Sequence, residues 1–203
     1  MIGYIDVCAR NHFRRKASFA STQTQEQEFT KRFPDVKEVI VDGTERSVQR
    51  PQNRERQKEY YSGKKKRHTC KQITVSTREK RVIILTKTRA GKVHDKRLLH
   101  ESEIVQYIPD EVAIEGDLGF HGLEKEFVNV HLPHKKPKGK ELTQQQKEEN
   151  RELSRQRVVC EHAHSGIKRY NCVHSVYRNR VTDFDDQLML VSAGLWNFYL
   201  DAA

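Results

Sequence analysis

Buried strands are predicted wherever short runs of β-branched and apolar residues interrupt this mostly polar sequence. Four such runs occur, at residues 36–41, 68–77, 81–88 and 112–114. The second and third are separated by residues 78–80 and predict two strands joined by a tight turn. The first run ends at Asp42 and the last run leads into Asp117. An acidic side chain at the end of a buried strand lies at the rim of a sheet, where functional residues often gather.

Helices are predicted at residues 95–106, 142–168 and 188–200. Asp95 stands where it could cap the first of them. The second is rich in Gln, Glu, Arg and Leu and lacks Gly and Pro until Gly166, a composition that favours a long helix. The order of strand, hairpin, helix, strand, loop and long helix predicts a mixed α/β domain. We expect a ribonuclease-H-like mixed sheet flanked by helices.

Two segments differ in composition from the predicted domain core. Residues 1–33 are polar, rich in Ser, Thr and Gln, and have little apolar periodicity, so we expect them to be weakly structured. Pro34 then precedes the first strand, and residues 34–203 are expected to form one domain. Within that domain, residues 46–68 are rich in Lys and Arg and predict a basic loop.

Charge and cysteine content narrow the class of protein. A formal net charge of +10 over 203 residues favours a polyanionic partner, with nucleic acid ahead of a membrane surface. No run approaches the roughly 20 apolar residues of a membrane span, and the first residues lack a secretory pattern. The scattered cysteines argue against a disulfide framework and a structural zinc site. We expect a reduced cytoplasmic protein. The cysteines are Cys8, Cys70, Cys160 and Cys172.

Glu161 lies in a charged stripe on the predicted long helix. Arg157 precedes it by four residues and Lys168 follows it by seven, so all three share a face of a helix with about 3.6 residues per turn. Carboxylates are the hard oxygen ligands that Mg²⁺ and Mn²⁺ prefer. Glu161 could therefore hold metal while Arg157 and Lys168 bind phosphates. A solvated salt-bridge face is the alternative interpretation.

Three further residues on the same helix invite a metal-site interpretation. Cys160, His162 and His164 are close in sequence. Alternate positions on a helix point about 200° apart, so the three cannot form one tetrahedral site. We expect packing or solvent exposure for these side chains.

Several segments together resemble the catalytic half of bacterial insertion-sequence transposases of the DDE superfamily, in the insertion-sequence-five and Harbinger-like group. The resemblance runs from about Phe33 to Leu200. It is carried by FPDVKEVIVDGTER, RPQNRERQKEYYSGKKKRHT, GKVHDKRLLHE, EGDLGFHGL, LPHKKPKGKELT and NRELSRQRVVCEHAHSGIKRY. The long helix also matches the last three positions of the Tyr-x2-Arg-x3-Glu-x6-Lys signature of such transposases. Ser154 stands at the tyrosine position, so the role of that tyrosine is not carried over.

The resemblance implies a catalytic triad of Asp42, Asp117 and Glu161 that holds two Mg²⁺ or Mn²⁺ ions. Asp95 matches a fourth acid of related sequences and is a further candidate metal ligand, although helix capping explains it equally well. The implied reaction is two-metal cleavage and strand transfer at transposon ends. The implied partners are double-stranded DNA, at terminal inverted repeats and at the target, and a second copy in a homodimer near the nucleoid. The expected DNA-binding residues are Arg157, Lys168, Lys64, Lys65, Lys66 and Arg67.

Two alternatives stay open at this stage. The first is a decayed or truncated transposase that binds DNA without cutting it. Family members usually carry an N-terminal helix-turn-helix region for end recognition, and residues 1–33 can be interpreted as a remnant of such a region. The second is a basic RNA-binding module, which predicts aromatic-rich strand motifs that this sequence lacks.

Overall fold

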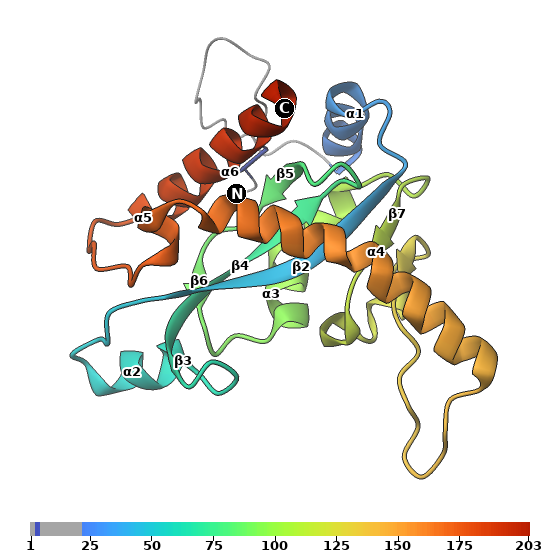
Figure 1. The fold of residues 1–203 in the computed structure, drawn as a ribbon, viewed down its shortest axis with the longest axis horizontal. Coiled ribbons are helices and arrows are strands. Elements are labelled where there is room, and N and C mark those ends of the chain that lie inside the picture. The colour runs from blue at the N-terminus through green and yellow to red at the C-terminus, as the bar shows by residue number, and fades with distance from the viewer. Residues whose placement is uncertain (1–2, 5–21) are drawn as a thin grey trace.

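The structure is a computed structural model and describes residues 3–4 and 22–203 (Figure 1). The strands run β1 Gly3–Tyr4, β2 Glu38–Ser47, β3 Tyr61–Ser62, β4 Arg67–Ser76, β5 Val82–Leu85, β6 Arg89–Ala90, β7 Ala113–Glu115 and β8 Val130–His131. They form a mixed sheet in the order β1–β5–β4–β2–β7–β8, and β3 and β6 also pair with β4. β2 is antiparallel to β4 and parallel to β7. The predicted ribonuclease-H-like α/β fold is confirmed.

Helices cover both faces of this sheet (Figure 1). α4, α5 and α6 pack on one face, and α1 and α3 pack on the other. Within the described part of the chain, no helix combines the length and the apolar character that crossing a membrane requires. The bounds are α1 Thr22–Arg32, α2 Arg54–Tyr60, α3 Asp95–Ser102, α4 Gln144–Lys168, α5 Asn171–His174 and α6 Phe184–Ala202, with short 3-10 turns η1 Ile104–Tyr107, η2 Leu118–Phe120 and η3 Leu123–Lys125.

The two faces of the sheet differ in polarity, as β4 illustrates. Side chains alternate between the faces of a strand. Ile73 and Val75 therefore pack in the apolar core with α1 and α3, whereas the hydroxyls of Thr74 and Ser76 lie 4.0 Å from Cys160 Sγ on α4. The face toward α4 thus buries polar groups, and it is the face that carries the candidate chemistry.

The start of α4 and its packing against α6 have identifiable causes. Thr143 Oγ1 accepts a hydrogen bond from the Gln146 backbone, and the Gln146 side chain accepts one from the Thr143 backbone, which is a capping box. Near the other end, a Cβ atom at Gly166 would lie 2.3 Å from the Trp196 ring, so glycine permits the close approach of α6. The long helix predicted at residues 142–168 is therefore confirmed, with its position set at both ends.

α1 corrects the prediction of weak structure for part of residues 1–33. Phe29 on this helix is fully buried in the core, and its ring lies 5.3 Å from that of Phe33. One aromatic anchor is sufficient to dock a helix whose other residues are polar, a tertiary effect that apolar periodicity does not reveal. Residues 1–2 and 5–21 lie outside the described residues.

Two further boundaries differ from the prediction. β2 does not end at Asp42 but continues to Ser47, because residues 42–47 pair with β4 as far as Thr69. The predicted basic loop at residues 46–68 is also not a simple loop. It contains α2, which Asn53 caps by accepting hydrogen bonds from the backbone of Glu55 and Arg56, and it contains β3.

Candidate active site

Parallel pairing of β2 and β7 brings Asp42 and Asp117 to the same place. Ile40 on β2 pairs with Glu115 on β7, and each aspartate lies two residues farther along its strand direction. Asp42 therefore sits within β2, and Asp117 follows the end of β7, where its carboxylate accepts a hydrogen bond from Gly119 N at 2.7 Å. Two acids separated by 75 positions in sequence thus share one edge of the site.

Asp95 joins these acids from α3. A Cβ atom at Gly43 would lie only 3.0 Å from Asp95 Oδ1, so the carboxylate presses against β2 beside Asp42. Lys71 Nζ pairs with the same oxygen at 2.8 Å. A side chain larger than hydrogen at position 43 would push Asp95 away, which explains the glycine there.

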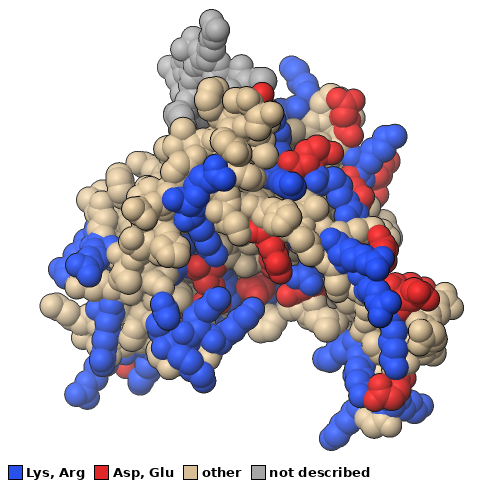
Figure 2. Space-filling view, viewed as in Figure 1, with Lys and Arg blue, Asp and Glu red and all other residues tan. Residues whose placement is uncertain are grey.

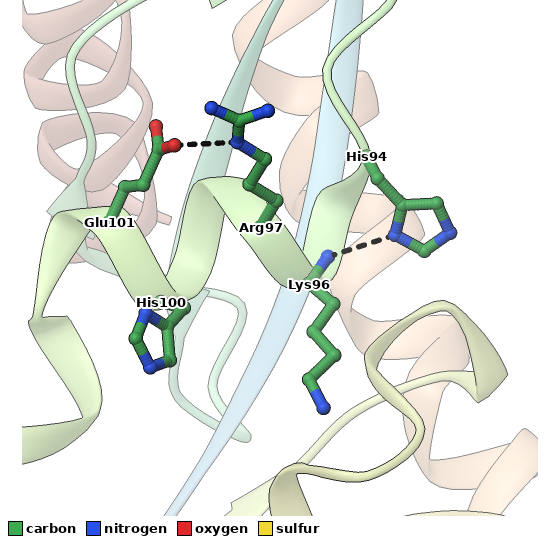
Figure 3. A pocket seen from close by; sticks show the side chains of 5 residues that line it. All are labelled: His94, Lys96, Arg97, His100 and Glu101. Atoms are coloured by element: carbon green, nitrogen blue, oxygen red, sulfur yellow. Dashed lines mark hydrogen bonds and ion pairs between the residues drawn. The ribbon is translucent and has the colours of Figure 1, made fainter.

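The cap of α3 is His94, so the predicted capping role of Asp95 is wrong. His94 Nδ1 accepts a hydrogen bond from the backbone nitrogen of Lys96 at 3.3 Å, as Figure 3 shows. Asp95 is the first residue inside the helix, and its carboxylate is free to face β2. The shallow pocket in Figure 3 contains none of the three aspartates, and its acid, Glu101, is paired with Arg97 at 2.6 Å.

The electrostatics of Asp42 reflect this crowding. Burial raises its pKa, and the negative charges of Asp117 and Asp95 raise it further, to about 6. Arg157 and a hydrogen bond of 2.8 Å from Gly43 N oppose the shift. A carboxylate that is buried among other carboxylates gains most from a nearby cation. The donor set of oxygen atoms fits a hard divalent ion.

α4 crosses the face of the sheet over β2 (Figure 1), and two of its side chains reach the acidic cluster. Arg157 Nη2 is 3.7 Å from Asp117 Oδ2, and one side of the His164 ring faces Asp42 Oδ2 at 3.8 Å. Glu161 lies between these two residues on the helix, within about 40° of Arg157 and 60° of His164 around its axis. Glu161 is exposed, so it stands at the open side of the same stripe.

The predicted cationic residues occupy two places near the cluster. Lys168 lies at the end of α4, where burial and the charge of Lys65 lower its pKa while Asp42 opposes that shift. Lys65 belongs to the exposed turn between β3 and β4, which also carries Lys64 and Lys66, and Arg67 follows as the first residue of β4. The positive charges of Lys65 in this basic turn and Lys168 at the end of α4 therefore repel one another. Figure 2 shows acidic side chains near the centre of this face with Lys and Arg on both sides.

Three residues of this region were not assigned by the sequence prediction. Thr74 Oγ1 is 2.7 Å from His164 Nε2, and Cys160 Sγ is 3.8 Å from the same nitrogen. The expectation that Cys160 and His164 only pack is incomplete. They are four residues apart on one face of α4, and their ligand atoms lie within 4.8 Å of one another and of Asp42. His162 is exposed, as expected from its position on the helix. The missed signal was the i, i+4 spacing.

Comparisons with known proteins match the segment that contains these residues. A family model described as "DDE superfamily endonuclease" matches residues 41–197, a range that includes all four candidate acids. The "Probable transposase for insertion sequence element IS702" of Microchaete diplosiphon is 36% identical over 163 residues, which are 80% of this chain and 57% of the relative. The chain thus spans a little over half the length of this curated relative. No solved structure matches.

Proposed function

Because the chain belongs to the DDE superfamily of endonucleases and insertion-sequence transposases, we propose that it cuts DNA at transposon ends and joins those ends to target DNA. The observation that carries this proposal is the convergence of Asp42 and Asp117 from parallel strands beneath the Arg157–Glu161 stripe of α4. The relative's printed name, a probable transposase, supports the same assignment.

The acids are the proposed ligands for divalent ions. Asp42, Asp117 and Glu161 form the primary set, and Asp95 is the fourth candidate, already held by Lys71. Two Mg²⁺ or Mn²⁺ ions held by such oxygen atoms would activate an attacking oxygen and stabilise the leaving one. Since Asp42 has a raised pKa of about 6, a divalent cation also relieves the repulsion among the acids.

The cationic residues are the proposed binding groups for the DNA backbone. The Arg157 side chain is 25% exposed and its Nη2 contacts Asp117 only at 3.7 Å, so the guanidinium can still take a phosphate. Lys168 and the basic turn of residues 64–67 extend this positive surface. In the proposed reaction, water attacks a phosphodiester at the end of the element. The freed 3′-hydroxyl then attacks the target strand while these cations hold both backbones in position.

Cleavage of a labelled terminal inverted repeat in Mg²⁺ or Mn²⁺ tests the assignment. We expect Asp42→Asn, Asp117→Asn and Glu161→Gln each to abolish nicking. Glu115→Gln is the matched control, because it replaces an acid with its amide two residues from Asp117 without altering the proposed ligand set. Full nicking by any of the three acid variants would disprove the role of that residue.

DNA binding without cleavage is the second candidate, and the basic turn favours it because its charges stand outside the acidic cluster. It predicts binding that persists in EDTA with no nicking in any divalent ion. In either case, Lys64→Ala with Lys65→Ala should weaken binding at every sequence and reduce the salt dependence by about one ion for each phosphate that the variant no longer neutralises. Lys135→Ala with Lys138→Ala provides a control of equal charge on the exposed segment before α4.

A further inference from the structure

A second set of metal-ligand atoms lies beside the carboxylate cluster. Asp42 offers an oxygen, Cys160 a sulfur and His164 a ring nitrogen, and these three atoms all lie within 4.8 Å of one another. Cys160 and His164 are buried, with 1% and 8% of their surfaces exposed. The proposed cleavage reaction uses neither the thiol nor the imidazole.

Hydrogen bonding at Thr74 determines which nitrogen of His164 is available. The Thr74 hydroxyl has one proton, which it donates to the backbone carbonyl of Asp42 at 3.3 Å. The same oxygen lies 2.7 Å from His164 Nε2, so Nε2 is the donor of this contact in the tautomer in which Thr74 donates to Asp42. The proton of a neutral imidazole is then on Nε2, and Nδ1 keeps its lone pair.

The lone pair of His164 Nδ1 faces another acceptor. Asp42 Oδ2 lies 3.8 Å away, and a carboxylate has no proton to donate when ionised. Two acceptors in this position are satisfied together by a cation between them. A ligating histidine whose other nitrogen is held by a hydrogen bond is also the usual arrangement at metal sites, and Thr74 supplies that bond here.

We propose that Asp42, Cys160 and His164 form a site for one borderline-soft divalent cation of the Zn²⁺ type. Sulfur and imidazole ligands select Zn²⁺ over Mg²⁺ and Mn²⁺, which prefer oxygen. Three protein ligands leave the fourth tetrahedral position open. Ligand atoms around tetrahedral zinc are separated by about 3.3 to 3.6 Å. The three ligand atoms here lie within 4.8 Å of one another, so the side chains would close by up to about 1 Å to bind the ion.

Binding involves one proton. Burial, followed by the negative charge of Asp42, raises the pKa of Cys160 to about 12, so the metal-free side chain is a thiol. Zn²⁺ forms a bond to sulfur, and the thiol proton leaves to solvent. No oxidant or reductant is required.

The site shares Asp42 with the proposed hard-ion site, and this consequence rests on the proposed function. An ion held by Cys160 and His164 draws the Asp42 carboxylate toward sulfur and away from Asp117. Zn²⁺ therefore inhibits Mg²⁺-dependent cleavage, and this inhibition requires the Cys160 thiol.

Titration of the metal-free protein with Co²⁺ tests the site without DNA. Co²⁺ takes the same ligands as Zn²⁺, and a bond to thiolate gives a charge-transfer absorption in the near ultraviolet. We expect this band at one ion per chain in the wild type and in Cys172→Ser, which removes an exposed cysteine as a control. Zn²⁺ should displace the Co²⁺ and abolish the band.

Two variants locate the ligands. Cys160→Ser, a change of one atom, should lose the band, and His164→Asn should weaken Co²⁺ binding by at least about tenfold, as loss of one ligand predicts. Far-ultraviolet circular dichroism confirms that each variant is folded. A wild-type protein without the band, or a Cys160→Ser protein that retains it, overturns the proposal, and the wild-type measurement stands even if a variant does not fold.

Cleavage assays separate the two proposals. With Mg²⁺ present, added Zn²⁺ should inhibit wild-type nicking, and Cys160→Ser should need at least about tenfold more Zn²⁺ for the same inhibition. Equal sensitivity of the two proteins disproves the sharing of Asp42. Absence of nicking in every protein contradicts the proposed function and leaves the Co²⁺ result unaffected.

Discussion

Two pairs of acids span the same two parallel strands, and each pair has one arginine. Glu38 on β2 and Glu115 on β7 share Arg78, which contacts both, Glu115 at 3.0 Å. Asp42 and Asp117 lie farther along the same strands and share Arg157 instead. Arg157 Nη2 contacts Asp117 at 3.7 Å. The charge of Arg157 lowers the pKa of Asp42, but by less than burial raises it.

The contrast separates a structural ion pair from a site that can accept a cation. Burial raises the pKa of Glu38, but hydrogen bonds, first from Arg78, more than offset it, so the net shift is downward. Asp42 has no such direct partner, and its pKa remains raised. Burial, and then the hydrogen bond with Glu38, raise the pKa of Glu115 to about 7, so Arg78 and a proton together balance the first pair near neutral pH. Among the described residues, the second pair has no arginine within hydrogen-bond distance, and in the proposed function a divalent ion neutralises its charge.

The largest expected difference between the two pairs is in catalysis. We expect Asp117→Asn to reduce the nicking rate by at least about 10³-fold, since metal-ion stabilisation of a transition state contributes several kcal/mol. Glu115→Gln makes the same change of acid to amide in the pair that Arg78 contacts and should leave nicking near the wild-type rate. Single-turnover nicking of a labelled duplex measures both. Equal loss in the two variants would contradict the distinction.

The strand pattern and the long helix allowed much of this comparison to be predicted from sequence. Apolar runs located β2 and β7 and marked Asp42 and Asp117, because a local pattern determines where a buried strand lies. The Arg157–Glu161–Lys168 stripe followed from helical spacing alone. Asp95 was predicted as the N-cap of α3, but the cap is His94, one residue earlier. This difference of one residue decides whether the Asp95 carboxylate bonds to its own helix or faces β2.

Contacts distant in sequence explain what the pattern did not predict. β2 continues past Asp42 because polar residues there are buried by partners far along the chain. Arg46, for example, is 4% exposed and donates a hydrogen bond to the backbone of Asp185 on α6. The pairing of His164 with Thr74 and Asp42 likewise requires the packing of α4 on β4. No local periodicity distinguishes such buried polar positions from exposed ones.

The next difference is in stability. Arg78→Met leaves two carboxylates side by side, and the Glu115 side chain is only 8% exposed, so we expect a loss of about 2 to 3 kcal/mol. Arg157→Met should cost less than about 1 kcal/mol, because Arg157 is 3.7 Å from Asp117 and makes no hydrogen bond to it, whereas Arg78 is hydrogen-bonded to Glu115. Urea unfolding at neutral pH measures both changes. Equal losses would show that Arg157 is as structural as Arg78.

The smallest expected effect is a gain in stability on removal of the Asp42 charge. The pKa of Asp42 is about 6 in the folded protein, against 3.8 as its ordinary value, because burial and then the neighbouring acids penalise the charged form. The folded state thus holds the proton more tightly, and the wild type loses stability as the pH rises from about 4 to about 6. Asp42→Asn avoids that loss.

We therefore expect Asp42→Asn to match the wild type below about pH 4 and to exceed it by about 1 to 2 kcal/mol above about pH 6, after discounting for the partial exposure of the carboxylate. Urea unfolding in EDTA across this range measures the difference. Asp110→Asn, at an exposed position before β7, is the charge-matched control and should show no such gain. If Asp42→Asn is no more stable than the wild type above about pH 6, the Asp42 carboxylate is already stabilised without a cation, as the Glu38 carboxylate is by Arg78. The two acid pairs would then not differ in the way proposed.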